Sequence, residues 1–167
     1  MKNTNNNHNQ NKSELYSLLQ KQLVALLEDE SHVIAGLSNT SALLYDALDD
    51  VNWLGFYLVH ENELLLGPFQ GKVACVHIAF GKGVCGTSYE KGETILVPDV
   101  HQFPGHIACD SASLSEIVVP IYCDDKVIGV LDADSPSLNR FDDQDKEGLE
   151  GIVRILEESL DFPNFSY

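Results

Sequence analysis

Three cysteines lie in sequence settings that could support redox chemistry: Cys75 in GKVACVHIAF, Cys85 in GKGVCGTSYE and Cys109 in FPGHIACDSAS. The segment around Cys109 is polar and has no regular period, and loops of this length often carry function. A cysteine acts as a redox nucleophile only as a thiolate that its substrate can reach. A thiol in a polar loop, with two further thiols and several carboxylates nearby in the sequence, therefore indicates redox chemistry on a small polar substrate.

Other roles for the thiols stay open at this stage. Small apolar thiols also fill cores, an interpretation that suits Cys123 in the apolar segment IVVPIYC best and Cys109 least. A structural zinc site is a weaker alternative, because the spacings contain no C-x-x-C knuckle. Acidic groups nearby would raise the pKa of a thiol. His101 and His106 are close to Cys109 in sequence and could offset this effect if protonated, although isolated loop histidines are often solvated bystanders.

Three carboxylates follow on the two arms of a predicted hairpin: Glu116, Asp132 and Asp134. Asp132 and Asp134 are two residues apart, so a strand directs both side chains to one face. Pairing of the two strands about the predicted turn at Asp124-Asp125 brings Glu116 to the same end of the hairpin as Asp132 and Asp134. Acidic clusters are often solvated faces, but the neighbours here are apolar, so we expect raised pKa values and one carboxyl group protonated as a general acid.

Trp53 and Tyr57 in NWLGFYL are spaced so that a strand places both rings on one face. They are either core residues or a rigid aromatic wall for a ligand that carries a methyl-sulfur group or a cation.

The composition limits the classes of function. With 26 acidic and 10 basic residues the net charge is -16, which argues against binding nucleic acid or an anionic membrane surface. No apolar run approaches the roughly 18–20 residues of a membrane-spanning helix. The Asn-rich start, residues 1–12, lacks the apolar region of a signal peptide and is predicted to be a disordered leader. We therefore expect a cytoplasmic protein, in which disulfides are transient rather than structural.

The periodicity predicts one α+β domain with a mainly antiparallel sheet and helices collected on one face. Helices are expected from Ser13, over 32–48, over 84–90 and from Phe141-Asp142. Strands are expected in NWLGFYLVHENELLLGPF (two, around a turn at 60–62), KVACVHIAF, TILVPDV and SEIVVPIYCDDKVIGVLDADS (a hairpin).

From Ser13 to Leu160 the chain resembles the free methionine-(R)-sulfoxide reductases, which are built on a single GAF domain. The resemblance rests on NWLGFYL, LGPFQGKVAC, GKGVCGTS, FPGHIACDSASLSEIVVPI, GVLDADSP and FDDQD. It implies a GAF-like central antiparallel sheet flanked by helices over residues 13–162, with 163–167 as a tail, and a homodimer. It also implies reduction of the free amino acid's R-sulfoxide, regeneration by thioredoxin, and neither metal nor organic cofactor.

The resemblance further implies roles for single residues. Cys109 would attack the sulfoxide, with Cys75 and Cys85 as resolving partners. Glu116, Asp132 and Asp134 would line the substrate pocket, with Trp53 and Tyr57 as its aromatic wall. The chain departs from the family pattern in Cys123 and in the Asn-rich leader. The alternative is a GAF-type sensor that binds a small molecule or reports oxidation without turnover, since function resides in the site rather than in the fold.

Overall fold

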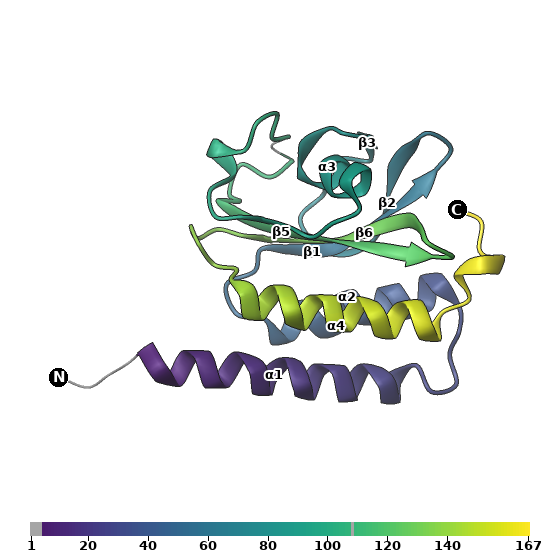
Figure 1. The fold of residues 1–167 in the computed structure, drawn as a ribbon, viewed down its shortest axis with the longest axis horizontal. Coiled ribbons are helices and arrows are strands. Elements are labelled where there is room, and N and C mark those ends of the chain that lie inside the picture. Colours follow the sequence, from purple (N-terminus) through teal and green to yellow (C-terminus); the bar gives the residue numbers. More distant parts are fainter. Residues whose placement is uncertain (1–4, 108) are drawn as a thin grey trace.

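A six-stranded antiparallel sheet forms the centre of the molecule (Figure 1). The computed structural model describes residues 5–107 and 109–167. The strands follow the order β3-β2-β1-β6-β5-β4 across the sheet. Their bounds are β1 (Trp53–His60), β2 (Glu63–Gly71), β3 (His77–Ala79), β4 (Ile95–Val97), β5 (Ser115–Cys123) and β6 (Lys126–Ser135). The predicted α+β class with a central antiparallel sheet is confirmed.

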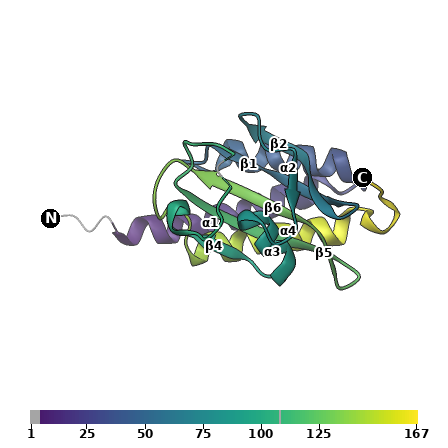
Figure 2. The same cartoon turned by 90° about the horizontal axis from the view of Figure 1, so that it is seen from above.

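Helices cover both faces of the sheet. On one face α2 (Val33–Ala47) and α4 (Asp143–Ser159) pack against the strands, and α1 (Asn5–Leu26) packs beneath α4. The short α3 (Gly83–Lys91) lies on the opposite face, as Figure 1 and the view from above in Figure 2 both show. The prediction that all helices gather on one face is therefore wrong for α3. The sheet is apolar on both faces, and α3 helps to cover the second of them.

The alternation along β5 and β6 decides which side chains reach the α3 face. Leu131 and Ala133 are buried in the larger core under α2 and α4, whereas Val130 belongs to the smaller cluster on the α3 side. Asp132 and Asp134 have the same parity as Val130, so they face α3 as well. The register pairs Glu116 with Asp134 and Val118 with Asp132. All three predicted pocket carboxylates therefore lie on one face, as their spacing indicated.

The first helix is longer than the sequence predicts. It begins at Asn5, before the expected start at Ser13, so the structure differs from the predicted disordered leader over residues 5–12; residues 1–4 lie outside the described residues. Extending an existing helix avoids the cost of nucleation. At the start of α4, Lys12 Nζ contacts Asp142 Oδ2 at 2.8 Å and Asp145 Oδ2 at 2.7 Å, which ties this turn of α1 to α4.

The third strand is shorter than predicted. Only His77–Ala79 pair with β2, and Cys75 lies in the loop before them rather than within a strand. The backbone at Cys75 makes a different contact: its carbonyl accepts a hydrogen bond from the Tyr57 hydroxyl at 2.9 Å. In the part of the chain that the structure describes, no helix has both the length and the hydrophobicity needed to cross a bilayer.

Candidate active site

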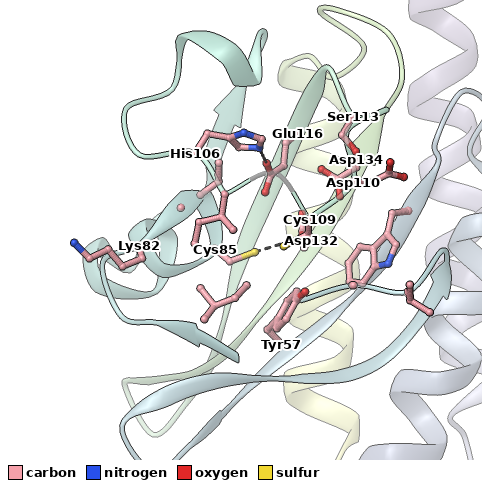
Figure 3. A pocket seen from close by; sticks show the side chains of 17 residues that line it. Tyr57, Lys82, Cys85, His106, Cys109, Asp110, Ser113, Glu116, Asp132 and Asp134 are labelled. Atoms are coloured by element: carbon pink, nitrogen blue, oxygen red, sulfur yellow. Dashed lines mark hydrogen bonds and ion pairs between the residues drawn. The ribbon is translucent and has the colours of Figure 1, made fainter. Parts of the chain in front are cut away.

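A pocket on the α3 face brings together most of the residues that the sequence singles out (Figure 3). It lies between the carboxylate-bearing ends of β5 and β6, the first turn of α3, and the loop that carries Cys109. The predicted site residues in its lining are Trp53, Tyr57, Cys85, Cys109, Glu116, Asp132 and Asp134. Cys75 is joined to the lining through its bond to Cys109.

Cys75 and Cys109 form a disulfide, with their Cα atoms 5.5 Å apart. Both residues are half-buried, and they come from two loops that precede β3 and β5 respectively. Among the described residues Cys85 and Cys123 are the free cysteines. Cys123 lies at the far end of β5, beside the hairpin turn and outside the pocket lining. Of the two pairings that the sequence left open for Cys109, the structure contains the one with Cys75.

Cys85 is a buried hydrogen-bond donor. It lies in the first turn of α3 with 4 % of its surface exposed, and its Sγ donates to Asp132 Oδ2 at 3.3 Å. Burial raises the pKa of this thiol well above its ordinary value, and the negative charge of Asp132 raises it further. In this disulfide-bonded form Cys85 is therefore a neutral thiol rather than a nucleophilic thiolate.

Glu116 and Asp132 form a crowded pair of buried carboxyl groups, each 6 % exposed. Burial is the main cause that raises the pKa of each group, followed by the charge of Asp134 for Glu116 and that of Glu116 for Asp132. One oxygen of Glu116 and one of Asp132 lie within 4.8 Å of each other. The pKa of Asp134 is raised too, by burial and then by Asp132 and Asp110. These directions agree with the raised pKa values expected from the sequence.

His106 lies against Glu116 and yet does little to neutralise it. Its Nε2 is 3.7 Å from Glu116 Oε2, and partial burial lowers the pKa of the imidazole. Sequence proximity to Cys109 was the only signal for this residue. The sequence did not decide whether His101 lies near Cys109; in the structure His101 is not part of the pocket lining.

Three polar residues of the site were missed by the sequence analysis. Asn52 Nδ2 donates to Asp110 Oδ2 at 3.1 Å and to Ser113 Oγ at 3.2 Å, and both acceptors belong to the pocket lining. The backbone N–H of Asn52 also donates to the Asp134 carbonyl at 3.0 Å. Asn52 thus fastens the loop that carries Cys109 to the start of β1, in the middle of the sheet. Nothing in the spacing of these residues signals that contact, because it joins positions far apart in the chain.

The aromatic wall has the arrangement that the strand spacing predicts. The rings of Trp53 and Tyr57 are stacked with centroids 5.9 Å apart, and the rings of Trp53 and Phe69 are stacked with centroids 5.3 Å apart. Trp53 Nε1 donates to the Lys72 carbonyl at 3.1 Å. Both rings are buried, and burial raises the pKa of Tyr57 beyond its usual range. The wall is therefore rigid, neutral and apolar toward the pocket.

The chain is similar to known proteins along most of its length. Residues 13–160 match the GAF domain. The free methionine-R-sulfoxide reductase of Escherichia coli is 51 % identical over 150 residues, covering 90 % of this chain and 91 % of that protein. A structure of fRMsr of Staphylococcus aureus in complex with substrate is 64 % identical, with a TM-score of 0.83 over 86 % of this chain and 94 % of that one. A putative GAF sensor protein from Burkholderia vietnamiensis is 54 % identical, with a TM-score of 0.87 over 89 % and 95 %.

Proposed function

Since this chain belongs to the free methionine-R-sulfoxide reductase family of GAF-domain proteins, we propose that it reduces free L-methionine-(R)-sulfoxide to L-methionine. The observation that carries the proposal is the disulfide between Cys75 and Cys109, which borders a pocket of buried carboxyl groups and stacked aromatic rings. A pocket with these parts supports a cysteine nucleophile, an acid and an apolar contact for the methyl-sulfur group.

In the proposed reaction the Cys109 thiolate attacks the sulfur of the sulfoxide. The oxygen accepts a proton from the pocket and passes to Cys109, which becomes a sulfenic acid as methionine leaves. The Cys75 thiol then condenses with the sulfenic acid, forming the disulfide and releasing water. An external dithiol reopens the bond by exchange. Overall, one sulfoxide and two thiols give one sulfide, one disulfide and one water.

We assign the proton to Glu116, because burial and the charge of Asp134 favour its protonated form. Asp132 accepts a hydrogen bond from the Cys85 thiol, and although burial raises its pKa in the substrate-free form, a bound α-ammonium would favour its anion. Together with Asp134 it would pair with the α-ammonium of the substrate, a group absent from methionine within a peptide chain. In the disulfide-bonded form Cys85 donates a hydrogen bond to Asp132. We propose Cys85 as a second thiol that could react with the sulfenic acid of Cys109 in place of Cys75.

The size of the pocket supports binding of substrate to the reduced form. The pocket has a volume of about 40 Å³ in this disulfide-bonded form. Ligand pockets usually measure about 300–1,000 Å³. The small volume of this disulfide-bonded form supports its assignment to the stage after the product has left.

The proposal also covers the reductant, the oligomeric state and the cellular compartment. Thioredoxin would be the reductant, the active form would be a homodimer, and the reaction would take place in the cytoplasm, where dithiol reductants are present. The half-buried disulfide is accessible enough for such an exchange after a small movement of either loop.

The test is oxidation of NADPH coupled through thioredoxin and thioredoxin reductase, with free L-methionine-(R)-sulfoxide as substrate. Cys109→Ser should abolish turnover, whereas Cys123→Ser, which removes a thiol outside the pocket, should retain it. Unchanged turnover in Cys109→Ser would contradict the proposed nucleophile. Binding of the sulfoxide with no NADPH oxidation by the wild type would favour the sensor alternative.

A further inference from the structure

Three ligand-type side chains converge at the base of the pocket from three elements. The Cys85 Sγ of α3, a Glu116 oxygen of β5 and an Asp132 oxygen of β6 all lie within 4.8 Å of one another, and all three residues are buried. Figure 3 labels all three side chains and marks the hydrogen bond between Cys85 and Asp132 with a dashed line. Thiolate, carboxylate and imidazole are the ligands that Zn²⁺ and related ions prefer, at distances of about 2.0–2.3 Å. Sγ and Asp132 Oδ2, 3.3 Å apart, are already close enough to bind one ion.

One atom of this cluster lacks a donor. Asp132 Oδ1 is buried and has no hydrogen-bond partner among the described residues. Asp132 is only 6 % exposed, so bulk solvent has little access to this oxygen. A buried carboxylate oxygen without a donor is costly unless a cation or a proton meets it. The cluster is thus built to receive positive charge.

We propose that Cys85, Glu116 and Asp132 bind one thiophilic divalent metal ion of the Zn²⁺ or Cd²⁺ class. The competition described next rests on the proposed function. The metal ion would occupy Asp132, which the α-ammonium of the substrate also needs, and Glu116, the proposed acid, so the ion is a competitive inhibitor and not a cofactor. A resident metal is not needed for any step of the reaction above.

The coordination step is an exchange of protons for metal. The Cys85 thiol releases its proton to the buffer and forms a sulfur–metal bond, and any proton on Glu116 or Asp132 is likewise released as their oxygens bind. The pocket volume of about 40 Å³ has room for a bound water as a further ligand. His106, whose Nε2 is 3.7 Å from a Glu116 oxygen, lies where a small rotation would add a nitrogen ligand.

The disulfide makes the test unusually specific. The protein is oxidised, treated with chelator to remove metal, and kept without reductant. Among the residues that the structure describes, Cys85 and Cys123 are then the free thiols, because Cys75 and Cys109 are bonded to each other. We would titrate this protein with Cd²⁺ and follow the ultraviolet thiolate-to-metal charge-transfer band, with Mg²⁺ as the hard-ion control. The expected result is one equivalent of Cd²⁺ bound with the band present, and no displacement by equal Mg²⁺.

Matched variants identify the thiol. Cys85→Ser should lose the charge-transfer band and weaken Cd²⁺ binding by more than about 100-fold, since losing even an outer partner of a metal site costs roughly 10–100-fold. Cys123→Ser should bind as the wild type does. If Cys85→Ser does not fold, Asp132→Asn is the second variant, and it should also weaken Cd²⁺ binding. A band that persists in Cys85→Ser, or is lost in Cys123→Ser, overturns the proposal, as does the absence of stoichiometric binding.

Turnover separates this inference from the proposed function. With the reductase assay Zn²⁺ should raise KM for the sulfoxide and leave kcat unchanged. Because binding is measured without turnover, Cd²⁺ bound through Cys85 in a protein without reductase activity would uphold the site and reject the proposed function. Reductase activity in a protein that binds no Cd²⁺ would do the reverse.

Discussion

Replacing Asp132 with Asn should make the stability of the folded protein less dependent on pH. Asp132 and Glu116 are each 6 % exposed; burial raises the pKa of both carboxyl groups, and the charge of Glu116 raises the pKa of Asp132 further. An unperturbed Asp titrates near about pH 3.9. Above that pH the unfolded chain releases protons that the folded protein retains, so the free energy of unfolding falls as pH rises toward the raised pKa.

The size of the effect follows from the number of retained protons. Each one contributes a slope of about 1.4 kcal/mol per pH unit while pH lies between the two pKa values. Removing the Asp132 carboxyl group removes one of these titrating groups, whose pKa burial raises in the folded protein. Between pH 5 and 7 the wild type should therefore lose about 1 to 3 kcal/mol of unfolding free energy relative to Asp132→Asn.

The assay is urea unfolding of oxidised protein at pH 5, 6 and 7, followed by far-ultraviolet circular dichroism. Asp46→Asn, which removes the same charge from an exposed position of α2, is the matched control and should run parallel to the wild type. His106, with its lowered pKa, acts in the opposite sense near pH 6, and the comparison between variants cancels that contribution. Equal slopes for wild type and Asp132→Asn would refute the reasoning from burial.

Three further perturbations test the packing that supports the site. Cys75→Ser removes the disulfide, whose cysteines are separated by 34 residues, and the chain-entropy relation gives an expected loss of about 4 kcal/mol of unfolding free energy. Urea unfolding without reductant should show this loss, and adding reductant should change the stability of the variant little. Gly148→Ala would place a Cβ 2.2 Å from the Tyr16 ring, so a loss of about 1–3 kcal/mol is expected by thermal melting, and wild-type stability would show that α1 moves away freely. Leu44→Ala, at a fully buried position, should cost about 2–5 kcal/mol, whereas Leu18→Ala, 53 % exposed, should stay within about 0.5 kcal/mol; equal losses would contradict the assignment of the core.

Local pattern in the sequence was enough to locate most of the fold and one side of the pocket. The period of two along β6 puts Asp132 and Asp134 on a single face, and the turn that closes the hairpin places Glu116 opposite Asp134. The capping residue Asp142 begins α4 by accepting hydrogen bonds from the backbone of Gln144 and Asp145, as the Phe141-Asp142 start predicted. These features depend on residues a few positions apart, so the chain itself specifies them.

Only the tertiary structure decided which thiol joins Cys109 and what surrounds it. Cys75 and Cys85 are both separated from Cys109 by many residues, and the packing of α3 on the sheet buries one of them while leaving the other in a facing loop. The same packing brings Asn52 to Asp110, and it seals the carboxyl pair from water. Distances between loops, and the burial that shifts a pKa, are properties of the whole packed chain. Periodicity cannot supply them, because it carries information about neighbours along the backbone and not about neighbours in space.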